Sequence, residues 1–323
     1  KEGKEGKAQS PRGSLNPNGF KSQISVYHAL QGVHLRTLSV PNMKGIFLNC
    51  TFTHDNKFLI GIGSAPDYKL VYWKWSNMKL ISSTSMPGAV TRVRVNPNNA
   101  AQITTSGPTH IKLWTLEKDL TLKCSSLLPQ KIEKNKNFVD HAWTKYGASL
   151  NTNSSNSNSS NSNSSSESSS NSGFILVATE KGTVLVLQVN EDGANHTSEI
   201  RQTIHLFQNQ KHVHHHHQKI STIQSYGKGF VVGGSNGYFA VFEQTDDIKD
   251  PFLPIRNFVT PNNHDIIHSI AVSPLGETIC TFVKPSNQLL MFPLAHIDMI
   301  EQDDGSGDNN PFTMVRQNGF HAG

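Results

Sequence analysis

Short segments of alternating apolar and polar residues recur along the chain, and each has a large apolar residue after an aliphatic one. In "KLVYWKW" (69–75), alternation places Tyr72 on one side of a strand and Trp73 and Trp75 on the other. Similar segments are "QISVYHAL" (23–30), "HIKLWTLE" (110–117), "TVLVLQVN" (183–190), "YFAVFEQT" (238–245) and "QLLMFPLA" (288–295). A strand that recurs at similar spacing indicates a repeated structural unit.

The large residues of these segments lie 41 to 55 residues apart once the 22-residue tract 151–172 is removed from the longest interval. A strand–turn–strand pattern precedes the recurrent strand, as in 47–68, and a weaker strand follows it, as in "HLRTLSV" (34–40). Four short strands per unit of about 40–45 residues are typical of a WD-type propeller blade. The sequence therefore predicts an all-β, WD40-like β-propeller with about five visible blades, preceded by the remnant of a third strand and containing few helices.

The recurrence also bears on the aromatic residues. Because the same position holds an apolar residue in every unit, we expect these side chains to pack between blades, and we prefer this to a ligand-binding aromatic platform at Trp73 and Trp75. The predicted blade-packing aromatics are Tyr27, Tyr72, Trp73, Trp114, Phe242 and Phe292. The units lack a clean Gly-His opening and Trp-Asp ending, so we expect the Asp-His networks of regular WD repeats to be mostly absent.

Several segments differ in composition from the blades. We expect 1–22 to be a disordered linker and 23–323 to form the blades, with low-complexity loop insertions at 151–172 and 209–218. The first insertion has no apolar residue and a single charge, too little to offset the entropy of ordering it. The chain begins with Lys1 and shows few blades for a closed propeller, which indicates a fragment.

Composition narrows the functional classes. The 29 basic and 24 acidic residues leave a formal charge of +5, and their scatter argues against nucleic-acid binding. Three widely spaced cysteines, Cys50, Cys124 and Cys280, favour a reducing compartment over a disulfide scaffold. No apolar run reaches the 18 residues of a membrane span, so we expect no membrane partner.

Motifs that carry catalysis lack their structural setting or are missing. The chain contains no C-x-x-C or H-E-x-x-H. The glycine-rich "VVGGSNG" (231–237) has the spacing G-x-S-x-G at 233–237, but it lies between two strands and opens no helix. The tract "HVHHHHQK" (212–219) has metal-binding chemistry, but no cysteine or carboxylate accompanies it, and a low-complexity insertion is the preferred interpretation. We predict no enzyme, no catalytic residue, no cofactor and no metal site. The alternatives are a propeller enzyme with polar groups in its central channel and a cytosolic WD-repeat adaptor of the ubiquitin-ligase or vesicle-coat type.

Four blocks resemble a known family in order and spacing: "FTHDNKFLIGIGSAPDYKLVYWKW" (52–75), "VDHAWT" (139–144), "SYGKGFVVGGSNGYFAVFE" (225–243) and "IHSIAVSPLGETICTFVKPSNQLLMF" (267–292). They resemble the amino-terminal propeller region of the WD-repeat axonemal family of cilia- and flagella-associated protein 57. The Asn/Ser and His tracts depart from that family.

The resemblance implies a non-enzymatic scaffold in the axoneme of the cilium or flagellum that helps to anchor or assemble inner dynein arms on doublet microtubules and so supports motility. The implied partners are inner-arm dynein subunits, other ciliary WD-repeat proteins and tubulin. Dimerisation would use a coiled coil outside this chain.

Overall fold

The structure is a computed structural model that describes residues 22–128, 132, 137–144, 173–192, 195–207, 218–260 and 264–294. Within these residues the chain forms 21 strands and one short 3-10 helix, η1 (Trp75–Asn77). The tract 151–172, nearly all of 209–218 and residues 1–21 lie outside the described residues. Ser22, at the end of the expected linker, is buried and donates a hydrogen bond to the carbonyl of Gly45.

The strands form six antiparallel sheets, which we name in chain order. The half-blade contains β1 (Gln23–Tyr27) and β2 (His34–Ser39). Blade 1 contains β3 (Phe47–Phe52), β4 (Leu59–Gly63), β5 (Lys69–Lys74) and β6 (Lys79–Ser85). Blade 2 contains β7 (Arg92–Asn96), β8 (Asn99–Gly107), β9 (His110–Leu116) and β10 (Leu122–Ser126).

The remaining three sheets follow the same order. Blade 3 contains β11 (Phe138–Trp143), β12 (Phe174–Thr179), β13 (Thr183–Asp192) and β14 (Asn195–His205). Blade 4 contains β15 (Ile220–Tyr226), β16 (Gly229–Gly234), β17 (Tyr238–Gln244) and β18 (Phe252–Val259). Blade 5 contains β19 (Ile266–Val272), β20 (Thr278–Lys284) and β21 (Gln288–Pro293).

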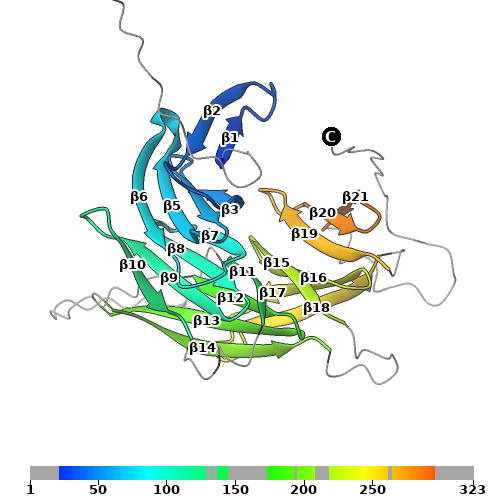
Figure 1. Ribbon diagram of the computed structural model, residues 1–323. Coiled ribbons are helices and arrows are strands. Elements are labelled where there is room, and N and C mark those ends of the chain that lie inside the picture. Colours follow the sequence, from blue (N-terminus) through cyan, green and yellow to red (C-terminus); the bar gives the residue numbers. More distant parts are fainter. Residues whose placement is uncertain are drawn as a thin grey trace, which may run out of the picture.

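The blades stand around a common centre, each with its first strand innermost (Figure 1). The inner strands β3, β7, β11, β15 and β19 pack against one another in that order. β3 and β19, at the two ends of the series, have no comparable packing between them. The fold is a β-propeller, as predicted. The recurrent segments of the sequence are the third strands of blades 1 to 5, namely β5, β9, β13, β17 and β21, and the first of the two strands of the half-blade, β1.

A bulge recurs in the inner strands. The register shifts between Phe47 and Asn49, between Phe138 and Asp140, between Ile220 and Thr222, and between Ile267 and Ser269. A bulge adds one residue to a strand and bends it. The same irregularity at the same place in four blades shows that the repeat extends to backbone geometry.

The hydrophobic core is divided among the contacts between neighbouring sheets. Five clusters of buried residues fill, in turn, the five contacts from the half-blade and blade 1 to blades 4 and 5. The middle strands β4, β12 and β16 are therefore buried along their whole length, since both of their faces meet another sheet. Their sequences accordingly contain only apolar residues and glycine, apart from Thr179 at the end of β12.

Candidate partner-binding surfaces

The aromatic pair in the third strand of blade 1 lies inside the protein. Tyr72 and Trp73 are each about 1% exposed and face opposite sides of the sheet, toward blade 2 and toward the half-blade respectively. The Trp73 ring packs edge-on against Phe47 with ring centres 5.5 Å apart. Trp75 starts the short helix η1 and is only partly buried, and its Nε1 donates to the Asn56 carbonyl at 2.7 Å. Trp73 is therefore inaccessible to a ligand.

Three further predicted aromatics are also buried, whereas Tyr27 is not. Trp114 donates from Nε1 to Thr105 Oγ1 at 2.8 Å, Phe242 stacks on Phe230 at 4.6 Å, and Phe292 packs edge-on against Phe239 at 5.7 Å. Tyr27 is 57% exposed at the end of β1, where a register shift separates it from Val26. The expected packing of Tyr27 is therefore corrected: the half-blade meets blade 1 through one face only, and Val26 fills that contact.

The inner strands of three blades share a buried carboxylate. Asp140 on β11 is 1% exposed. Arg94 Nη2 and Arg92 Nε, both on β7, lie 3.4 Å and 3.6 Å from its Oδ1. From β15, the hydroxyl of Thr222 and the backbone N–H of Ile223 donate to Oδ2 at 3.1 Å and 3.3 Å. Asp140 on blade 3 therefore links blades 2 and 4. Replacing it would leave the two arginines without their counter-charge, which is costly for partly buried groups.

His141, the next residue, faces blade 2. One of its ring nitrogens lies 2.8 Å from Ser106 Oγ and the other 2.8 Å from Thr104 Oγ1, which also accepts a bond from Trp143 Nε1. Complete burial, with a smaller contribution from the charge of Arg94, lowers the pKa of His141 to about 3. The neutral ring joins two blades by hydrogen bonds and is enclosed away from solvent.

This network is not the Asp-His network of a regular WD repeat, which we expect to be mostly absent. Its aspartate and histidine are adjacent on one inner strand, and their side chains bond different partners. Two sequence features signal it: "RVRV" (92–95) alternates arginine with valine, and "VDHAW" (139–143) places two titratable residues in an otherwise apolar strand. Neither feature reveals the other, because their contact depends on the packing of blades 2 and 3.

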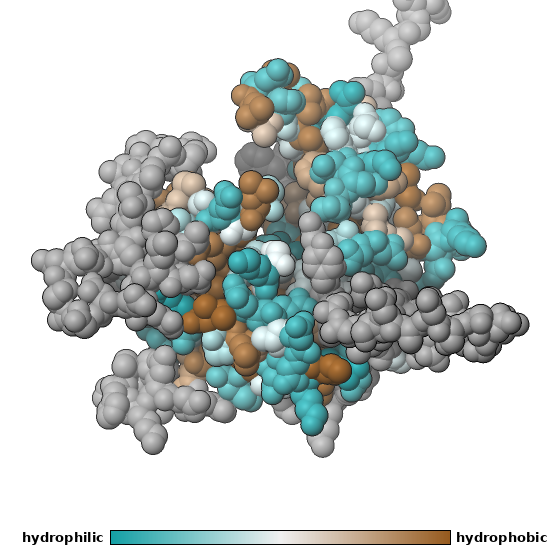
Figure 2. Space-filling view, turned by 180° about the vertical axis from the view of Figure 1, so that it is seen from behind, coloured by the Kyte–Doolittle hydropathy of each residue, from teal (hydrophilic) through white to brown (hydrophobic). Residues whose placement is uncertain are grey.

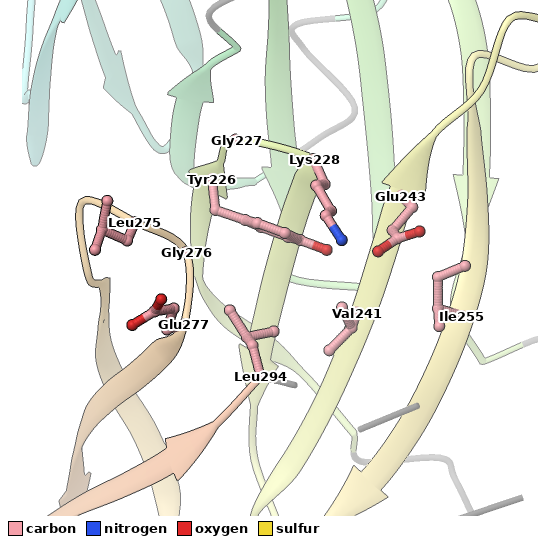
Figure 3. A pocket seen from close by; sticks show the side chains of 10 residues that line it. All are labelled: Tyr226, Gly227, Lys228, Val241, Glu243, Ile255, Leu275, Gly276, Glu277 and Leu294. Atoms are coloured by element: carbon pink, nitrogen blue, oxygen red, sulfur yellow. The ribbon is translucent and has the colours of Figure 1, made fainter. Parts of the chain in front are cut away.

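A groove between blades 4 and 5 is the first candidate docking surface, with a volume of about 270 Å³. Tyr226 ends β15, Lys228 lies in the β15–β16 turn and Glu243 is on β17. Figure 3 shows the Tyr226 hydroxyl and the Lys228 amine directed toward Glu243. Leu275 and Glu277, from the β19–β20 turn, line the opposite side. These residues offer mixed charge around an apolar base, a surface suited to binding a protein segment.

Reactive groups are few in the described part of the chain. No set of three or more His, Cys, Asp or Glu side chains is placed to hold a metal ion there. Cys50, Cys124 and Cys280, all in that part of the chain, form no disulfide there, and burial raises the pKa of the Cys50 and Cys280 thiols. No helix among these residues combines the length and the apolar character that crossing a bilayer requires. On the face seen from behind, apolar side chains form small groups among polar ones (Figure 2).

Comparison with known proteins adds two sequence relatives. No protein-family model matches the chain. Mouse cilia- and flagella-associated protein 57 is 22% identical over 255 residues, which cover 76% of this chain and 20% of that protein. Mouse cilia- and flagella-associated protein 44 is 36% identical over 66 residues, 20% of this chain and 4% of that protein. This chain is similar to ciliary proteins. It spans a fifth or less of the length of either relative, and which member it resembles most stays a prediction.

A solved structure supports the fold independently. The crystal structure of the Cps50 (Swd1) β-propeller domain of Myceliophteria thermophila superposes with a TM-score of 0.63 over 88% of this chain and 82% of that domain. The two sequences are 12% identical, so the likeness concerns the fold alone. The chain is therefore a β-propeller with weak similarity to ciliary proteins.

Proposed function

We propose that this chain belongs to a non-enzymatic WD-repeat scaffold of the ciliary or flagellar axoneme that helps to anchor or assemble inner dynein arms on doublet microtubules. The observation that carries the proposal is the coincidence of a propeller fold with the 22% identity to cilia- and flagella-associated protein 57 over three quarters of the chain. Both relatives are named for cilia and flagella, which supports the location.

The physical features of the propeller agree with a scaffold. Two of its buried titratable residues, Asp140 and His141, bond to neighbouring blades, and the surface grooves lie between blades where partner segments can dock. The net charge of +5 favours contact with acidic protein tails such as those of tubulin, although single exposed pairs are weak and screened by salt. Inner-arm dynein subunits, other ciliary WD-repeat proteins and tubulin are the proposed partners.

The test is performed on the full-length protein in a ciliated cell. We expect the tagged protein to remain with axonemes after detergent extraction. Disrupting its gene is expected to leave cilia assembled but beating abnormally, with some inner-arm dyneins missing from the isolated axonemes. A protein released into the soluble fraction, together with an unchanged set of dyneins in the disrupted cells, would reject the proposal and favour the cytosolic adaptor.

A further inference from the structure

A second groove lies on the other side of blade 4, between the outer strands β14 and β18, and has a volume of about 360 Å³. Its base is apolar, as expected for a site that buries a side chain. The apolar lining residues are Ile204, Leu206, Phe242, Phe252, Leu253 and Pro254.

Four polar side chains that line this groove have no hydrogen-bond or ion-pair partner among the described residues: Thr203, Tyr238, Asp250 and Asn257. Tyr238 is the most informative of them, because its side chain is 3% exposed and its buried hydroxyl is unpaired. Burial raises the pKa of Tyr238 to about 12, so the hydroxyl keeps its proton and remains a donor. A buried donor without a partner is costly in a folded protein, and a ligand group that accepts from it recovers that cost.

The backbone of β18 is already occupied at this point. The side chain of Gln202 on β14 donates to the Phe252 carbonyl at 2.9 Å and accepts from the Phe252 N–H at 3.1 Å. Two residues further along, Pro254 has no N–H to offer. A ligand in the groove is therefore recognised through side chains, since pairing with β18 as an additional strand is blocked.

The rim of the groove carries one carboxylate. Asp250, from the 245–250 loop, is the single acidic residue among those that line the groove. The loop is held by the Thr245 N–H and hydroxyl, which donate to the carbonyls of Pro251 and Asp250 at 2.8 Å and 2.9 Å. A carboxylate beside an apolar base favours a cation next to an apolar group.

We propose that the groove between β14 and β18 binds a short extended segment of a partner protein in which an aliphatic or aromatic residue is adjacent to a lysine or arginine. The apolar side chain enters the base formed by Phe242 and Phe252, and the cation meets Asp250. The Tyr238 hydroxyl donates to a backbone carbonyl of the segment. The inference deepens the proposed scaffold role by stating what the propeller recognises, but it is tested on the isolated chain and does not depend on the location in the cell.

The probes are capped hexapeptides with a central pair of residues flanked by glycine and serine, measured by NMR line broadening with the 323-residue chain. We expect Leu-Arg and Phe-Lys pairs to bind, and we expect replacement of the basic residue by glutamate to weaken binding at least tenfold. Binding should also weaken between 50 mM and about 500 mM salt, because the Asp250 carboxylate is exposed. Failure of every pair to bind, or equal binding of the Arg and Glu peptides, would overturn the proposal while leaving the axoneme test unaffected.

Two variants connect binding to the groove. Tyr238→Phe is expected to weaken the Leu-Arg peptide about three- to tenfold through one lost hydrogen bond, while the melting temperature stays the same or rises because an unpaired buried hydroxyl is removed. Asp250→Asn is expected to remove the preference for the basic peptide. Glu117→Gln, an exposed residue of the β9–β10 turn in blade 2, is the matched control and should change neither.

Two results would contradict this assignment. Unchanged binding by Tyr238→Phe and Asp250→Asn together would place the peptide elsewhere on the protein. Binding that appears only after residues 209–218 are deleted would show that the groove is covered in the intact chain.

Discussion

At the residue scale, the stability of the propeller depends on side chains that each serve two sheets. Trp73 lies between blade 1 and the half-blade, and Trp114 lies between blades 1 and 2 while its N–H bonds Thr105 on the neighbouring strand. Truncating a large side chain between two sheets removes buried apolar contacts and leaves a cavity, and both effects destabilise the fold.

The first prediction concerns these two tryptophans. Trp73→Ala or Trp114→Ala is expected to lower the free energy of unfolding by about 3–5 kcal/mol, as truncation of large buried aromatics does. Trp75→Ala is the control and should cost clearly less, because Trp75 is only partly buried. Denaturant titration followed by circular dichroism measures the difference. A near-neutral Trp73→Ala would mean that this ring is not part of the core.

The second prediction concerns pH. In the unfolded chain His141 has a pKa of about 6.5, whereas burial holds its pKa in the folded protein at about 3. Between these values the unfolded state binds a proton that the folded state does not, so the free energy of unfolding falls as the pH falls. Through this one proton, His141 lowers the free energy of unfolding by at most about 1.4 kcal/mol for each pH unit.

The measurement compares the protein with His141→Gln between pH 7 and 5, where carboxylates add little. We expect the variant to be less stable at pH 7 but to lose stability less steeply on acidification. Parallel curves for the two proteins would show that His141 takes up a proton in the folded state.

At the element scale, the connection between β11 and β12 shows how a blade accommodates a long insertion. Thr144 and Phe174 bond each other across the base of the connection, through Thr144 N–H to the Phe174 carbonyl at 2.9 Å and Phe174 N–H to Thr144 Oγ1 at 2.8 Å. The two strands are therefore joined at their ends as in an ordinary hairpin, and the number of residues between them is free to vary.

The third prediction follows from this closed base. Deleting 151–172 is expected to leave the melting temperature unchanged or slightly higher. The free-energy cost of closing a loop falls by only about 0.6 kcal/mol each time the loop length is halved. Thr144→Val is the contrasting variant, and it should destabilise the blade by about 1 kcal/mol through loss of the Oγ1 bond. Differential scanning calorimetry distinguishes them. A drop of several degrees on deletion would show that the tract packs against the propeller.

At the scale of the whole molecule, the two ends of the blade series are apolar. Leu48 and Phe52 on β3 are exposed at one end, and Ile266 on β19 is exposed at the other. In the other blades the corresponding strand lies between two neighbours (Figure 1). Exposed apolar strands are sites of association between chains.

The fourth prediction is that the isolated 323-residue chain self-associates as its concentration rises. Replacing Leu48 and Phe52 by lysine is expected to reduce the association, since charge on an exposed strand opposes pairing. Ser85→Lys, on the outer strand β6, adds a charge elsewhere and should have little effect. Light scattering over a range of concentrations measures the mass. A monomer at every concentration would show that the exposed apolar residues on β3 and β19 do not cause self-association.

The sequence by itself determined the strands and their grouping. Apolar residues at alternating spacing have to be buried in strands, and the Gly, Pro, Asn and Asp clusters between them mark turns. The recurrent segments, the weak fourth strands and the entry point of the Asn/Ser tract all follow from such local patterns. The burial of Trp73 follows as well, because a residue that is apolar in every unit faces the contact common to all units.

Only the tertiary structure decided what meets what across the blades. Tyr27 occupies the repeat position but lies exposed, since its sheet has a neighbour on one side only. Asp140 contacts Arg92 and Arg94 because β7 and β11 become neighbours in the fold. The groove with the unpaired Tyr238 hydroxyl forms because β14 and β18 lie next to each other. Partners that lie tens of residues apart leave no local pattern, because their contact depends on the twist and packing of whole sheets.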